Sequence, residues 1–67
     1  MEFAAKAMAR KVCAVIKDNS KRSLCITLLT KVLVYGESVK NEVKEEFRKN
    51  FTEEERELIK KALAELG

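Results

Sequence analysis

The chain lacks histidine, tryptophan and proline, and it has only two cysteines and two glycines. Histidine is the commonest general base and zinc ligand, and two cysteines do not complete a four-ligand structural zinc site. No glycine-rich phosphate-binding loop is present, and the glutamates fall on helix faces that we expect to be exposed to solvent. The sequence therefore predicts a protein that is not an enzyme and holds no cofactor, metal or small-molecule substrate.

Long apolar runs are also missing. The longest, Leu24 to Tyr35, is interrupted by Lys31 and is too short to cross a bilayer. The first residues carry Lys6 and Arg10 within their apolar run, so they resemble neither a signal peptide nor a spanning segment. We expect a cytoplasmic protein without a membrane partner, whose cysteines are free thiols because disulfides are uncommon in the cytosol.

The residues that are present suit one small helical domain covering residues 1–67. The chain is 46% hydrophobic and 37% charged, with a formal net charge of +3. A domain of this size buries only about 60% of its unfolded surface, and its core supplies roughly 3–5 kcal/mol. We therefore expect additional stabilisation, for example from association with a partner.

Apolar spacing predicts three or four short helices in a compact antiparallel bundle. A first amphipathic helix extends through Ile16, and the segment from Ser23 to Tyr35 forms a second helix that is apolar over more than half its circumference. β-branched residues make a strand conceivable there, but no partner strand exists elsewhere. This wide apolar face places the second helix centrally. The third helix, with a thin stripe of Val39, Val43 and Phe47, lies outside.

Local signals define the helix ends. Asp18, Asn19 or Ser20 can cap the second helix, and Ser38 can cap the third. Gly36 suits the position after a helix C-terminus, where a left-handed conformation is needed, although one continuous helix through Gly36 is an alternative. Thr52 followed by Glu55 matches a capping box and predicts the start of the last helix.

The two cysteines have different predicted surroundings. Helical phase puts Cys13 on the polar side of the first helix between Arg10 and Lys17, a setting that favours a reactive thiolate and a redox-sensitive dimer. Cys25 lies on the apolar face of the second helix. Both are equally far from Asn19, so a helical hairpin would bring them to similar height, but the phase predicts that they point in different directions.

Basic residues in the first third of the chain allow a second interpretation, a small nucleic-acid-binding regulator. Phosphate contacts by these side chains would give salt-sensitive binding. The second and third helices also resemble a helix-turn-helix in outline, but Glu42, Glu45 and Glu46 on the would-be recognition helix would repel phosphates. The candidate contact residues are Lys6, Arg10, Lys11, Lys17, Lys21 and Arg22.

Protein association is the function that these patterns favour. The apolar circumference of the second helix exceeds what so short a chain is expected to cover. We therefore expect a non-enzymatic protein–protein interaction module, most simply a homodimer formed through the second and third helices. Its predicted interface residues are Leu28, Val32, Tyr35, Val39, Val43 and Phe47.

Overall fold

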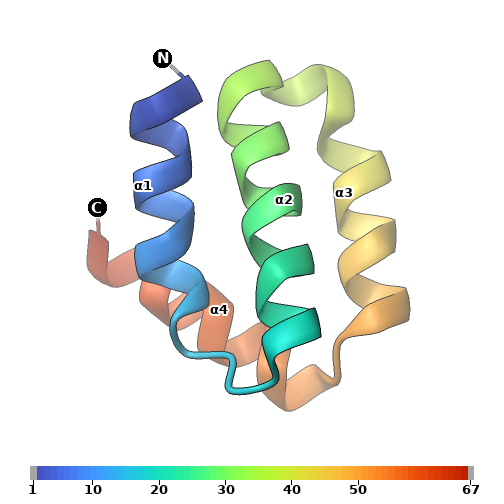
Figure 1. Ribbon diagram of the computed structural model, residues 1–67. Coiled ribbons are helices and arrows are strands. Elements are labelled where there is room, and N and C mark those ends of the chain that lie inside the picture. Colours follow the sequence, from blue (N-terminus) through green and yellow to red (C-terminus); the bar gives the residue numbers. More distant parts are fainter. Residues whose placement is uncertain (1, 67) are drawn as a thin grey trace.

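The computed structural model describes residues 2–66 and has the expected all-helical architecture. Four helices follow one another: α1 (Glu2–Cys13), α2 (Asn19–Tyr35), α3 (Glu37–Asn50) and α4 (Glu53–Leu66) (Figure 1). Within these residues no strand occurs. Each described helix is too short or too polar to span a bilayer.

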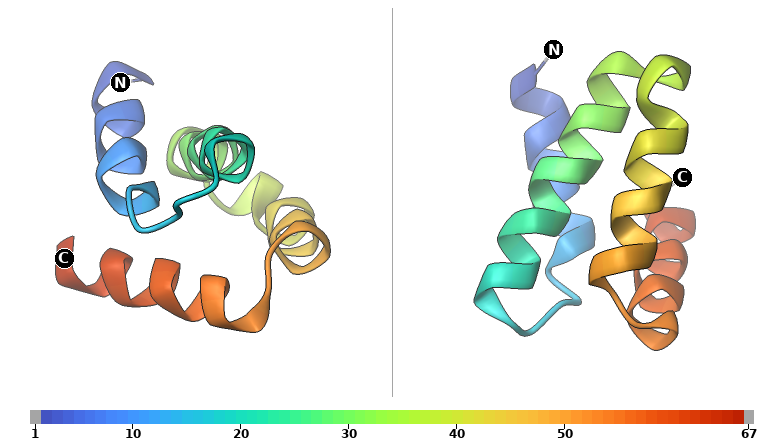
Figure 2. Two further views of the ribbon diagram at one scale, coloured as in Figure 1. Left: turned by 60° about the horizontal axis from the view of Figure 1, so that its bottom comes forward. Right: turned by 90° about the vertical axis from the view of Figure 1, so that its right-hand side faces the viewer.

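Helices α1, α2 and α3 lie side by side as antiparallel neighbours with α2 in the middle, and α4 crosses them at a steep angle (Figures 1 and 2). Helix α4 packs against α1 and α3, but over the described residues none of its Cα atoms lies within 8 Å of one in α2. The prediction that the second helix is central is therefore confirmed. The backbones of α2 and α4 stay apart, so these two helices contact each other only through side chains.

Two of the predicted caps are present. The Asp18 carboxylate accepts the Lys21 amide at 2.8 Å, so α2 begins at Asn19 and includes four residues before the apolar segment from Ser23 to Tyr35. At the start of α4, the Thr52 amide donates to Glu55 Oε1 at 2.8 Å and the Glu55 amide donates to Thr52 Oγ1 at 3.1 Å. This reciprocal pair satisfies two amides that the helix leaves free and confirms the capping box.

Gly36 separates α2 from α3, so the continuous-helix alternative is wrong. Its φ is +66°, as a glycine after a helix permits, although its ψ of −137° lies outside the left-handed helical region. Its amide donates to the Val32 carbonyl at 2.8 Å and closes α2. Ser38 does not cap α3, because its hydroxyl donates back to the Tyr35 carbonyl at 3.1 Å.

A single core fills the space between the three-helix layer and α4. Every helix contributes, and Phe51 adds a buried ring from the α3–α4 connection. The α1 side is built from small residues, with Ala9 fully buried against its neighbours, which lets α1 approach closely. The buried cluster comprises Ala9, Val12, Cys13, Ile16, Cys25, Leu28, Leu29, Val43, Phe51 and Ile59.

Within this core, Cys13 and Cys25 form a disulfide that joins α1 to α2, with their Cα atoms 5.9 Å apart. The prediction of two free thiols is wrong, and so is the exposed position of Cys13, which is 0% exposed. Ala9 is buried and Met8 is exposed, so the inner face of α1 is turned by roughly 65° from the predicted one, toward Cys13. The helix also ends at Cys13, so the phase extrapolated to Ile16 does not apply.

Polar contacts fix the corner where α1 turns into α2. The Arg22 guanidinium donates to the carbonyls of Ile16 at 2.9 Å and Lys17 at 3.2 Å, and it also bonds Asn19. The Lys21 ammonium pairs with Glu55 at 3.0 Å and so links the starts of α2 and α4. These contacts and the disulfide hold three helices together at one end of the bundle.

Candidate functional site

A groove of about 520 Å³ lies where α3 and α4 diverge above α2. Its floor is apolar and comes from three helices. Leu29, Val43 and Ile59 are buried at the bottom of the groove. Val32, Phe47 and Leu63 are half-buried and reach the surface. The complete floor consists of Leu29, Val32, Val43, Phe47, Ile59 and Leu63, and we call the whole site the α3–α4 groove.

Phe47 is held in place within this floor. Its ring packs against the ring of Phe51 with the centroids 5.1 Å apart and the planes tilted by 40°. Phe51 is itself buried, so it fixes the position of Phe47 from below. Tilted aromatic pairs of this kind add roughly 0.5–1.5 kcal/mol beyond the area they bury. The ring of Phe47 is therefore held in place in the floor by the ring of Phe51.

Five cations line the two long walls of the groove. Lys40, Lys44 and Arg48 are four residues apart on α3, and Arg56 and Lys60 are four apart on α4. Residues four apart lie on one side of a helix, so each wall presents a row of positive charge. We call these five side chains the rim cations.

The acidic residues near the groove are fewer. Glu53 and Glu57, both on α4, complete the lining, so the five rim cations leave a net charge of +3. Glu57 pairs with Lys60 at 3.7 Å. On the other side of α3, Glu42 pairs with Lys31 of α2 at 3.1 Å, outside the groove. On α3 itself, Glu37 pairs with the rim cation Lys40 at 3.8 Å, so two of the five rim cations already have acidic partners.

The structure divides the predicted interface residues. Val32, Val43 and Phe47 meet in the groove, whereas Tyr35, which is 60% exposed, and Val39 lie outside it. Leu28 and Val43 are buried, and Val43 also forms part of the groove floor. The apolar face of α2 is so wide that the sequence does not distinguish the side covered by α1 from the side left open.

The predicted nucleic-acid contacts do not all remain available. Lys21 pairs with Glu55 and Arg22 donates to backbone carbonyls, so both side chains already have partners within the chain. The other four residues of that set are exposed: Lys6, Arg10, Lys11 and Lys17.

The proposed redox role of Cys13 also needs correction. Its sulfur is bonded to Cys25 inside the core and is not a thiolate exposed between Arg10 and Lys17. A redox-sensitive dimer through an exposed Cys13 is therefore not compatible with this fold.

Among residues 2–66, no cluster of three or more cysteine or acidic side chains is arranged to hold a metal ion.

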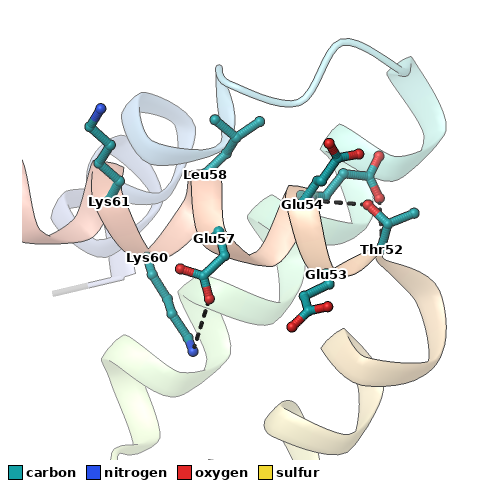
Figure 3. Close-up of a pocket in the computed structure, with 8 residues that line it drawn as sticks. Thr52, Glu53, Glu54, Glu57, Leu58, Lys60 and Lys61 are labelled. Carbon is teal, nitrogen blue, oxygen red and sulfur yellow. Dashed lines mark hydrogen bonds and ion pairs between the residues drawn. The ribbon is translucent and has the colours of Figure 1, made fainter.

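A second depression runs along the outer side of α4 between Thr52 and Lys61 (Figure 3). All of its lining residues belong to this one stretch of chain, and Figure 3 shows the Glu57–Lys60 pair at its edge. A single helix provides only one wall, so a ligand would stay exposed to solvent on its other sides. We therefore regard the α3–α4 groove as the candidate site.

Sequence reasoning missed the rim cations because it treated α3 as a charged outer helix. A signal for them was present. Lys40, Lys44 and Arg48 follow a four-residue spacing beside the apolar stripe of α3, and Arg56 and Lys60 repeat it on α4. The sequence alone does not show that α4 crosses the other helices. This crossing brings the two rows to opposite walls of one groove.

The comparisons with known proteins found no relative for this fold and groove. The chain matches no protein-family model, no curated protein and no solved structure. The residues of the groove are therefore the basis for any statement about function.

Proposed function

We propose that the protein is a non-enzymatic protein–protein interaction module that holds a helix of its partner in the α3–α4 groove. The single observation that supports this is the apolar floor, which is open to solvent between two basic walls. Helix-in-groove recognition uses apolar anchors at positions i, i+3 or i+4, and i+7 of the bound helix. The α3 wall from Lys40 to Arg48 covers eight residue steps, or about 12 Å, which is long enough for such a set at about 10.5 Å.

A titration with a synthetic amphipathic helix tests this proposal. The peptide carries leucines at i, i+4 and i+7 and glutamine at its other surface positions, and binding is followed by amide NMR shifts. We expect the shifts to map to the groove, since the apolar anchors contribute most of the binding free energy. Absence of any shift in the groove with such peptides would refute the proposed function.

A matched pair of variants on α4 makes the test specific. Leu63 lines the groove and is half-buried, whereas Leu58 is exposed on the same helix outside it. Leu63→Gln should weaken peptide binding at least fivefold, and Leu58→Gln should leave it unchanged. Both variants must first show the dispersed spectrum of the folded protein.

Self-association through the predicted interface residues stays a prediction, and sedimentation at high micromolar concentration tests it. Two grooves facing each other in a symmetric dimer would bring Lys40, Lys44 and Arg48 of both protomers together. Like charges that meet in an interface oppose association. For this reason we place the groove's partner in a different protein.

The cytoplasmic location also stays a proposal, and the disulfide bears on it. Disulfides persist in oxidising compartments and in the cytosol of some hyperthermophiles, but they are rare in other cytosols. Trapping free thiols with an alkylating agent in intact cells, followed by mass spectrometry, would show whether Cys13 and Cys25 are bonded where the protein works.

A further inference from the structure

We infer that the helix held in the α3–α4 groove is acidic, with carboxylates on both sides of its apolar stripe. This inference rests on the proposed function and adds the chemistry of the partner. The lining contains five cations and two carboxylates. Lys60 is paired with Glu57 and Lys40 with Glu37, which leaves Lys44, Arg48 and Arg56 without an ion pair among the described residues. An incoming acidic side chain therefore meets an excess of positive charge.

The positions of the rim cations on both walls determine which shape of ligand fits the groove. Three rim cations belong to the α3 wall and two to the α4 wall, and the apolar floor lies between them. A ligand that satisfies both walls must present an apolar strip flanked by acids along its length. An amphipathic helix does this, because positions three and four apart share a face and the flanking positions point to either side. A fatty acid carries one charge at one end and leaves most of the rim unmatched.

A second copy of this chain does not supply such a helix within residues 2–66. The outer surface of α1 is basic, with Lys6, Arg10 and Lys11 exposed. On α4, the exposed large apolar residues are Leu58 and Leu66, eight residues apart with Lys61 between them. The other exposed large apolar residues are Phe3 and Met8 on α1 and Leu33 and Tyr35 on α2. No described helix therefore exposes a row of three large apolar anchors, and the groove is suited to a partner of different sequence.

Three helical peptides with the same leucine stripe test the inference, with glutamate, glutamine or lysine at the flanking positions. An exposed ion pair contributes a factor of roughly 1.4 to 5 in affinity, so three such pairs give about tenfold. The glutamate peptide should therefore bind about tenfold more tightly than the glutamine peptide at low salt. The lysine peptide should be the weakest. The difference should shrink as salt screens the rim, over roughly 50 to 500 mM.

Two double variants identify the cations responsible. Lys44→Glu with Lys60→Glu reverses one charge on each wall, whereas Lys49→Glu with Lys61→Glu reverses exposed charges on the same two helices outside the groove. Each lowers the net charge of +3 by four, so bulk electrostatic effects are matched. The first should weaken glutamate-peptide binding about tenfold, and the second by less than about twofold.

Each outcome distinguishes this inference from the proposed function. Equal binding of the glutamate and glutamine peptides in the groove would overturn the acidic partner and leave the interaction module intact. No binding of any peptide would overturn both. Groove shifts produced by oleate or by phosphatidylglycerol vesicles, with none from peptides, would also overturn both and assign the site to an anionic lipid. A dimer that Lys44→Glu with Lys60→Glu dissociates would assign the groove to a second copy.

Discussion

Reducing the Cys13–Cys25 disulfide is the perturbation that the structure predicts to have the largest effect on stability. The bond closes a loop of 12 residues in sequence separation between two adjacent helices. In the chain-entropy description, opening a loop of this length costs about 3 kcal/mol. A core of this size supplies roughly 3–5 kcal/mol in total, so the reduced protein should be only marginally folded. The expected fall in the midpoint of thermal unfolding is about 12–24 °C.

Circular dichroism during heating, with and without a phosphine reductant, measures this difference. The variant in which both cysteines are alanine is the control, because its midpoint should match that of the reduced protein and should not respond to reductant. Thiol counting by alkylation and mass spectrometry must find no free thiol before reduction. Two free thiols in the protein purified without reductant, or a midpoint that reductant moves by less than about 2 °C, would refute the reasoning.

Three further predictions concern local features of the fold. Thr52→Ala removes the hydroxyl that accepts the Glu55 amide and should lower the free energy of unfolding by about 1 kcal/mol in urea titrations; no change would contradict the capping box. Gly36→Ala should cost about 2 kcal/mol, because a positive φ strains any residue with a Cβ although nothing lies within 4 Å of the added atom. The Thr52 amide, followed by Lys21, lowers the pKa of Glu55 from its ordinary value of 4.5. Its stabilising contribution is therefore complete above about pH 4.5 and is lost as the pH falls through the lowered folded pKa. Unfolding midpoints measured across this range should show a shallower pH dependence for Glu55→Gln than for the unmodified protein.

Local sequence signals predicted the helix boundaries that depend on near neighbours. The cap at Asp18, the break at Gly36 and the box at Thr52 each involve residues three or four positions apart, so the sequence contains their whole cause. The position of Cys13 was not predictable in this way. It depends on which side of α1 faces α2, and that is decided by the close approach that Ala9 allows. When two neighbouring faces of a helix both carry short side chains, rotation of the helix about its axis can exchange the buried face for the exposed one.

The groove likewise follows from packing between helices, and its cause can be traced to α2. This helix is apolar over more than half its circumference, so it needs cover on several sides, yet residues 2–66 form only three other helices. Helices α1 and α3 cover its flanks, while α4 contacts those two helices and keeps its backbone away from α2. The remaining side of α2, with Val32 half-buried, becomes the floor between α3 and α4. The same crossing places the cations of α3 and α4 on opposite walls. An apolar surface that the chain leaves partly open is therefore bordered by positive charge, and these two properties together define the partner that we propose.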